Sequence, residues 1–376
     1  MWRTKLLELR ARAKNVYDLM RYLHAPVCHI ARSLGLPLTI KFVNYLITWR
    51  CNSRCIMCNI WKKSSSGQKE LGADEIEDIF ADPLLSKLEW IQLSGGEPFL
   101  RKDIAEIVRV LLELHPKLHV YISTNGMLPS AIDNFLMETR RYHNRITIGV
   151  SVDGIGPLHD SVRGVTKAFQ RVVETMEVLR KYAGVNINVS MTVMPINYKA
   201  FPDVMAFAKK YKASFGFQMA QVSAYFSNVE KKECIIFDHS SFKDAAKLIL
   251  QTLSRCALKP SALFDLKAKL YYSASLCNQV IPCFSGFHSF ALDPEGNIFP
   301  CLPWIGYSEG FGSVREKTLK EIWKSDQARK IRKEIAKGNC PGCWLECEIA
   351  RSLDKSWPLL VGEILCSKGS SQSSFS

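Results

Sequence analysis

Residues 43–58 read VNYLITWRCNSRCIMC, an apolar run that leads directly into three closely spaced cysteines. The run has the length and the β-branched content of a buried strand. The thiols of Cys51, Cys55 and Cys58 then follow on one loop. A structural zinc site takes four ligands, whereas three thiolates on a cubane of four irons leave one iron without a protein ligand. That vacant iron position is the feature that points to function.

Runs of the same kind recur along the chain and alternate with helical patterns at 103–115 and 166–183. Strand and helix alternating at this spacing predict a parallel sheet with right-handed crossovers. Six such units predict an α/β protein built on a partial (β/α)6, TIM-like barrel. The predicted strands span residues 43–49, 88–94, 118–124, 146–152, 185–194 and 213–220.

Short polar segments close the first four predicted strands, namely TWRCNSRC, LSGGEP, STNG and SVDG. Asn-Gly and Asp-Gly pairs are common in turns, so one such segment alone carries little information. In a barrel of this kind, functional residues gather where the strands end. The four segments together therefore predict one shared site.

The cysteines outside this loop fall into two sets, one scattered along the chain and one grouped near its C-terminal end. The N-terminus lacks the apolar centre of a signal peptide, so we expect a cytoplasmic protein in which the grouped members of its 13 cysteines bind metal rather than form disulfides. We expect the scattered ones to be small buried hydrophobes: Cys28, Cys234, Cys256, Cys277 and Cys366. A second group lies in a region rich in Gly, Pro and Trp: Cys283, Cys301, Cys340, Cys343 and Cys347.

These segments resemble the radical S-adenosylmethionine (SAM) superfamily over roughly residues 43–347. The hallmark CxxxCxxC after the first barrel strand is matched by Cys51, Cys55 and Cys58. The GGE segment after the second strand is matched by Gly95, Gly96, Glu97 and Pro98. STNG and SVDG also look like this family. One position departs from it, because Met57 stands where the family often has an aromatic residue.

The resemblance implies a [4Fe-4S] cluster whose open iron binds SAM, and reductive cleavage of SAM to a 5′-deoxyadenosyl radical that abstracts hydrogen from a substrate. Within the GGEP segment, the backbone of Gly95 and Gly96 would approach the methionine moiety, and Glu97 would accept from its amino group. Further contacts to ribose, carboxylate or another anionic group are expected from Thr124, Asn125, Ser151 and Arg163. An electron donor such as flavodoxin or ferredoxin is implied as a partner.

The second cysteine group resembles the SPASM extension of radical SAM enzymes, or its shorter twitch form. This implies an auxiliary [4Fe-4S] cluster held by Cys283, Cys301, Cys340 and Cys343, with Cys347 as an alternative or additional ligand. A zinc site of four thiolates is the alternative that the spacings also allow. The resulting domains are an N-terminal helix (1–36), the barrel core (37–260), the auxiliary domain (261–350) and a tail (351–376).

Residues 1–33 show a helical apolar stripe with basic residues largely off it. The helix, which Gly35 and Pro37 would end, either packs on protein or contacts an anionic membrane peripherally. The formal charge of +14 is spread along the chain, and we expect no nucleic-acid partner. DPEGNIFPC predicts a hairpin turn, and residues 318–338 predict one helix.

The substrate class follows only as an expectation. Because a single helix precedes the barrel, we expect a small-molecule or glycan-type substrate that is oxidised or epimerised. A maturase acting on a ribosomally made peptide is one alternative, and a non-catalytic iron–sulfur or zinc module is another.

Overall fold

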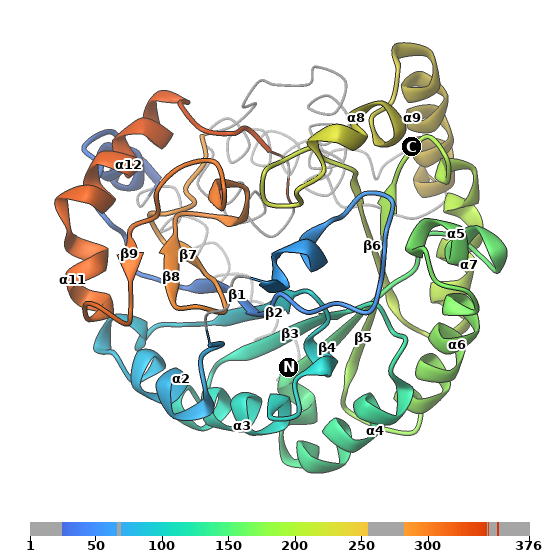
Figure 1. The fold of residues 1–376 in the computed structure, drawn as a ribbon, viewed down its shortest axis with the longest axis horizontal. Helices are drawn as coiled ribbons and strands as arrows, with labels where there is room; N and C mark the ends of the chain where they lie inside the picture. The colour runs from blue at the N-terminus through green and yellow to red at the C-terminus, as the bar shows by residue number, and fades with distance from the viewer. Residues whose placement is uncertain (1–24, 66–68, 255–281, 344, 346–351, 353–376) are drawn as a thin grey trace, which may run out of the picture.

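The computed structural model describes residues 25–65, 69–254, 282–343, 345 and 352. Its core is a curved, parallel sheet with helices along the outer side (Figure 1). The six predicted strands are all present, so the prediction of a partial (β/α)6 barrel is confirmed. They are β1 (Phe42–Thr48), β2 (Trp90–Gly95), β3 (His119–Thr124), β4 (Ile146–Ser151), β5 (Asn186–Val193) and β6 (Ser214–Met219).

The barrel helices follow from amphipathic sequence. In α3 (Ile104–Leu114) the side chains that repeat at three- and four-residue steps are buried against the sheet, among them Ile104, Ile107, Val108 and Leu111. The predicted helices at 103–115 and 166–183 are confirmed as α3 and α6. The helices of the barrel region are α2 (Ala73–Phe80), α3 (Ile104–Leu114), α4 (Pro129–Glu138), α5 (Pro157–Arg163), α6 (Ala168–Leu179), α7 (Phe201–Lys210), α8 (Lys232–Ile235) and α9 (His239–Ser254).

The C-terminal region continues the barrel sheet. Strand β7 (Ser289–Leu292) pairs in parallel with β1, and β8 (Asn297–Phe299) and β9 (Gly312–Ser313) add antiparallel strands beyond it. The predicted turn between β7 and β8 is confirmed, because Asp293 Oδ1 accepts from the backbone N–H groups of Glu295 and Asn297 at 3.0 and 2.8 Å. The auxiliary region therefore lies against the first barrel strand.

The prediction of a single helix over residues 318–338 is wrong in one respect. The segment forms two helices, α11 (Leu319–Lys324) and α12 (Asp326–Lys337), separated at Ser325. The Ser325 hydroxyl accepts from the backbone N–H of Ala328, which starts a new helix at that position. Helix α12 ends at Gly338, as expected.

The N-terminal helix is described only in part. Residues 25–33 are helical and Gly35 has a left-handed φ of +69°, so the predicted end of the helix is confirmed. Residues 1–24 lie outside the described residues, as do Cys256, Cys277, Cys347 and Cys366. Cys28 is buried as expected, but Cys234 is exposed on the four-residue helix α8, so that expectation was wrong for it.

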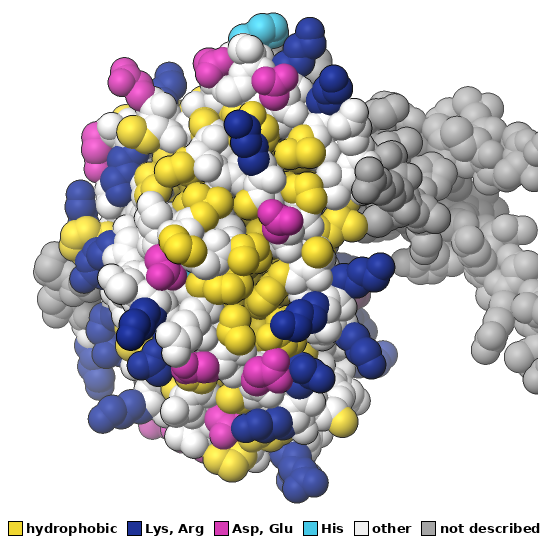
Figure 2. Space-filling model, turned by 90° about the vertical axis from the view of Figure 1, so that its right-hand side faces the viewer, with side chains coloured by type: hydrophobic (Ala, Val, Ile, Leu, Met, Phe, Trp, Pro, Cys, Tyr) yellow, Lys and Arg dark blue, Asp and Glu magenta, His cyan; other side chains and the backbone are white. Residues whose placement is uncertain are grey.

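Charge is mixed on the face that Figure 2 shows, where Lys and Arg side chains alternate with Asp and Glu around an apolar centre. The positive excess therefore does not form one continuous patch there, and the absence of a nucleic-acid partner stays a prediction. None of the helices within the described ranges has both the length and the apolarity needed to cross a membrane.

Candidate active site

A cavity of about 190 Å³ lies where the barrel strands end. Its wall brings together segments that are up to 175 positions apart in the sequence, from Cys51 to Phe226. Glu97 and Pro98, although adjacent in sequence, are not part of this wall. The sequence-predicted residues that line it are Cys51, Cys55, Cys58, Gly95, Gly96, Thr124, Asn125, Ser151 and Arg163.

The cysteine loop, residues 51–58, is held in place by backbone hydrogen bonds to the end of α5. The backbone N–H of Arg54 donates to the carbonyl of Arg163 at 3.0 Å, and that of Ile56 donates to the carbonyl of Val162 at 2.9 Å. These two bonds lie on either side of Cys55. Gly164 has a φ of +63°, and a Cβ there would lie 2.4 Å from the Arg54 carbonyl oxygen. Only glycine therefore lets α5 pack this closely against the loop.

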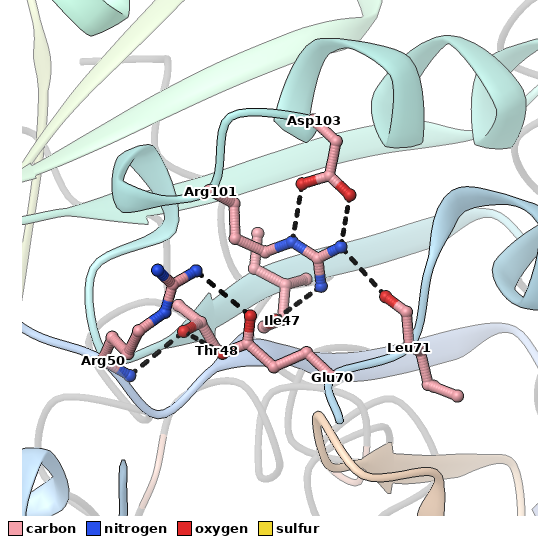
Figure 3. A network of polar contacts seen from close by, with 7 residues as sticks. All are labelled: Ile47, Thr48, Arg50, Glu70, Leu71, Arg101 and Asp103. Carbon is pink, nitrogen blue, oxygen red and sulfur yellow. Dashed lines mark hydrogen bonds and ion pairs between the residues drawn. The ribbon is translucent and has the colours of Figure 1, made fainter. Parts of the chain in front are cut away.

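A polar network fixes the segment that leads into the same loop (Figure 3). Arg50, which precedes Cys51, contacts Glu70 at 3.2 Å between Nη2 and Oε2, and the Thr48 hydroxyl also donates to Glu70. Buried Arg101 donates from Nη1 to the Ile47 carbonyl at 3.0 Å and pairs with Asp103. The network ties the end of β1 to the segment that follows the cysteine loop, which restrains the loop at its base.

The two glycines of the GGEP segment are required by packing within the chain. Gly95 has a φ of +111°, and a Cβ there would lie 2.3 Å from the Thr48 carbonyl oxygen. A Cβ on Gly96 would lie 2.0 Å from the Arg50 carbonyl oxygen. The end of β1 thus occupies the space that a side chain would need, and the expected approach to a methionine moiety stays a prediction.

Glu97 is fully buried behind the cavity wall. Its carboxylate accepts from the Thr124 hydroxyl at 2.8 Å and from the backbone N–H groups of Asn125 and Phe99 at 2.7 and 3.1 Å. The Asn125 side chain in turn donates to Asn52 Oδ1 at 2.7 Å, next to Cys51. In this arrangement Glu97 positions β3 residues and, through Asn125, the cysteine loop. Its expected role as acceptor for an amino group stays a prediction.

Burial raises the pKa of Glu97 to about 7, against an unperturbed 4.5, while the three donors act in the opposite direction. Between about pH 4.5 and pH 7, the folded protein therefore keeps a proton on Glu97 that the unfolded chain has released. The stability that this proton contributes is present below about pH 4.5 and is lost as the pH rises through about 7.

We expect the wild type to lose on the order of 3 kcal/mol of unfolding free energy, relative to Glu97→Gln, between pH 4.5 and pH 8. Urea unfolding of both proteins at several pH values measures this difference. Because all other groups are shared, they cancel in the comparison. A difference that stays constant across the pH range would contradict the prediction.

Arg163 reaches the cavity from a buried ion pair. Its Nη2 lies 2.7 Å from Asp153 Oδ2, and its Nη1 donates to Cys55 Sγ at 3.7 Å. Burial alone would lower the pKa of Arg163, but the Asp153 carboxylate beside it raises that pKa. Asp153 is itself fixed by the backbone N–H of Thr192, which donates to Oδ1 at 2.8 Å. Arg163 is therefore a fixed cation at the cysteine loop.

Sequence reasoning missed several residues of this site, and two of them, Asp153 and Ser94, carry polar groups that bear on its chemistry. Asp153 lies in the SVDG segment, which was quoted without a role for its carboxylate, although a buried cation next to the cysteines requires a counter-ion. Ser94, in LSGGEP, borders the cavity, and within the described chain its buried hydroxyl has no hydrogen-bond partner. An unsatisfied hydroxyl at a cavity wall is suited to a polar ligand.

The cysteine thiols themselves fit a metal cluster. Burial raises the pKa of Cys51 to about 11 and that of Cys58 to about 12, so neither would ionise readily at neutral pH without a nearby cation. Iron ions supply that charge. No group of three or more His, Cys, Asp or Glu among the described residues is arranged around a single metal ion. A cubane does not need such convergence, because each thiolate binds a different iron.

The second cysteine group lies on the β7 side of β1. Cys283 and Cys301 are buried, and Cys340 and Cys343 are partly buried. One apolar cluster contains Trp49, Tyr225 and Leu302 and packs against both Cys58 and Cys343. The two cysteine groups therefore border the same packed region between the barrel mouth and the C-terminal strands.

Two family models match the chain. The radical SAM superfamily model matches residues 45–208, and the SPASM iron–sulfur cluster-binding domain matches residues 283–347. The chain belongs to the radical SAM superfamily. The SPASM match begins at Cys283 and ends at Cys347. This radical SAM enzyme thus uses a [4Fe-4S] cluster with SAM and carries an auxiliary iron–sulfur cluster.

Curated relatives of the enzyme have several activities. The AdoMet-dependent heme synthase of Methanosarcina barkeri is 27% identical over 81% of this chain and 88% of its own length. The Fe-coproporphyrin III synthase of the same organism is 24% identical over 80% of each chain. The mycofactocin maturase MftC of Mycobacterium tuberculosis is 23% identical over 83% of this chain and 77% of its own.

Solved structures show the same fold at low identity. The enzyme anSMEcpe with bound AdoMet is 16% identical with a TM-score of 0.59, covering 89% of this chain and all of that one. SuiB of Streptococcus suis, bound to its precursor peptide SuiA, is 17% identical with a TM-score of 0.58, covering 79% of this chain and 67% of that one. At this level of identity, these similarities establish only the fold of the radical SAM enzyme.

Proposed function

We propose that Cys51, Cys55 and Cys58 hold the SAM-binding cluster and that the enzyme oxidises or epimerises a small-molecule or glycan-type substrate. The observation that carries the proposal is the cavity itself: it borders on these three thiols, and no fourth cysteine is among the described residues that line it. When bound, the cluster and SAM supply the 5′-deoxyadenosyl radical that removes hydrogen from the substrate.

The chain's own residues would bind and orient SAM. Arg163, held by Asp153, places a fixed positive charge suited to a carboxylate. Ser94 and Ser151 offer hydroxyl groups around the same cavity, and the buried Ser94 hydroxyl has no partner among the described residues. The Thr124 hydroxyl, which also borders the cavity, donates to Glu97. Glu97 holds Thr124 and the Asn125 backbone in place. We assign the auxiliary cluster to Cys283, Cys301, Cys340 and Cys343, and Cys347 lies outside the described residues.

Anaerobic reconstitution with iron and sulfide tests the proposal. We expect about eight irons per chain and formation of 5′-deoxyadenosine from SAM only in the presence of a reductant such as reduced flavodoxin or ferredoxin. Substrate candidates labelled with deuterium should transfer the label to 5′-deoxyadenosine. Protein that binds zinc and leaves SAM intact would support the non-catalytic alternative instead.

The small-molecule assignment is supported by relatives named as heme and coproporphyrin synthases. A peptide substrate is the second candidate, favoured by the similarity to MftC and to the SuiB structure with its precursor peptide. Deuterium transfer decides between them: label that moves only from a peptide would replace the small-molecule proposal.

We further propose that the N-terminal helix contacts an anionic membrane surface. In its described part, Val27, Ile30 and Leu34 lie on the outer face and are 59, 61 and 48% exposed. Residues 1–36 hold seven Lys or Arg and two acidic residues. An exposed apolar strip in a segment whose sequence is rich in Lys and Arg suits a lipid surface that carries negative charge.

We expect the enzyme to sediment with phosphatidylserine-containing vesicles and to lose at least about tenfold in binding when Val27, Ile30 and Leu34 are all changed to serine. Vesicles of phosphatidylcholine alone are the control for charge. A second control changes Met137, an exposed residue of α4, to serine. Binding that survives the triple substitution would remove the membrane contact.

A further inference from the structure

Arg32 connects the N-terminal helix to the first cysteine of the auxiliary site. Its Nε donates to the Cys283 carbonyl at 2.8 Å, and its Nη2 donates to the Ile335 carbonyl at 3.2 Å. The guanidinium carbon lies 6.0 Å from the centre of the Phe284 ring. In Figure 1 this dark-blue helix lies beside α12. A residue 251 positions away in sequence therefore binds the backbone of a predicted cluster ligand.

Among the described residues, no acidic side chain balances the charge of Arg32. The side chain is half-buried, and within the described chain no carboxylate pairs with it. The ionisable groups that act on it are the thiols of Cys283 and Cys340. Taking a guanidinium out of water without a counter-ion is unfavourable. Thiolates that carry an iron cluster would supply the missing negative charge at this position.

The loop that begins at Cys283 is held by backbone contacts as well. The backbone N–H of Leu38 donates to the Phe287 carbonyl at 2.7 Å, and that of Lys41 donates to the His288 carbonyl at 2.9 Å. Buried Arg332, between the rings of Trp323 and Phe311, donates to the Gly286 carbonyl at 2.6 Å. Arg332 is fully buried in protein, whereas Arg32 is half-buried and binds the backbone of Cys283 itself. Arg32 is therefore a cation placed next to a predicted cluster ligand.

We propose that Arg32 is a positioning residue for the auxiliary iron–sulfur cluster, fixing the Cys283 backbone and balancing the negative charge of the cluster. The inference rests on the proposed ligands Cys283 and Cys340. A nearby cation stabilises the more negative, reduced form of a cluster and so raises its reduction potential. The N-terminal helix thereby sets how readily the auxiliary cluster accepts an electron.

The test isolates the auxiliary cluster in the full chain. Cys51, Cys55 and Cys58 are changed to alanine together, the protein is reconstituted anaerobically, and the midpoint potential of the remaining cluster is measured by EPR-monitored titration. Into this background we introduce Arg32→Met, Arg32→Lys and Arg329→Met. Arg329 is an exposed arginine of α12 beside Gly35, so its loss removes the same charge without touching the Cys283 loop.

We expect Arg32→Met to shift the potential to more negative values and to speed iron loss to a chelator about tenfold. Arg32→Lys should keep most of the potential, because it keeps the charge, and Arg329→Met should match the background. An unchanged potential in Arg32→Met, an equal shift in Arg32→Lys, or an equal shift in Arg329→Met would overturn the inference. If the triple-alanine protein holds no iron, both the inference and the assignment of the auxiliary cluster ligands are wrong. SAM cleavage by the wild type is scored separately and tests the proposed function alone.

Discussion

Replacing Cys55 with alanine is expected to reduce 5′-deoxyadenosine formation at least about 100-fold and to lower the iron content from about eight to about four per chain. Cys55 lies at the centre of the loop, its thiol receives the Arg163 Nη1 hydrogen bond, and the backbone on both sides of it is fixed by the end of α5. The loop cannot move another ligand into its place. Two thiolates would remain, which is too few to retain the cluster.

The matched control is Cys234→Ala. Cys234 is an exposed cysteine of α8, outside both cysteine groups, and its loss should leave the iron content and SAM cleavage at wild-type values. Iron is measured by colorimetric assay and 5′-deoxyadenosine by mass spectrometry. Unchanged SAM cleavage in Cys55→Ala would show that the cluster is held by other residues, and the site assignment would then be abandoned.

Changing Asp153 to asparagine is expected to lower the free energy of unfolding by about 3–5 kcal/mol. Asp153 is fully buried, and its partner Arg163 is buried as well, so the substitution leaves a guanidinium without a counter-ion in a low-dielectric environment. The neutral amide oxygen of asparagine can still accept hydrogen bonds but cannot balance the charge. Arg163 would also lose its fixed orientation beside Cys55, so SAM binding should weaken.

An exposed ion pair provides the comparison. Arg171 and Glu174 contact at 3.4 Å with side chains 58 and 41% exposed, and Glu174→Gln should cost at most about 1 kcal/mol. The double variant Asp153→Asn with Arg163→Met should be less destabilised than the sum of the two single variants, because the buried charge is gone. Urea unfolding gives all of these values. A cost for Asp153→Asn as small as that for Glu174→Gln would show that the pair is not buried in solution.

The barrel and the cluster loop could be predicted because their signals are local. A buried strand is visible as a run such as LHVYIST, and the alternation of strands and helices restricts the topology to a parallel sheet. Cys51, Cys55 and Cys58 lie within eight positions, so their proximity follows from the chain itself. The C-terminal hairpin was equally local, since Asp293 and Gly296, three positions apart, form its turn.

Only the tertiary structure decided what the remaining polar residues do. The sequence placed Glu97 beside the glycines but could not show that it faces inward, towards Thr124 and the Asn125 backbone. The contact between Arg32 and Cys283 joins residues 251 positions apart, and no sequence period encodes such a distance. Local patterns determine which residues form strands and loops, because they depend on neighbouring side chains. Which polar groups meet depends on how the strand ends pack, and that is set by the whole core.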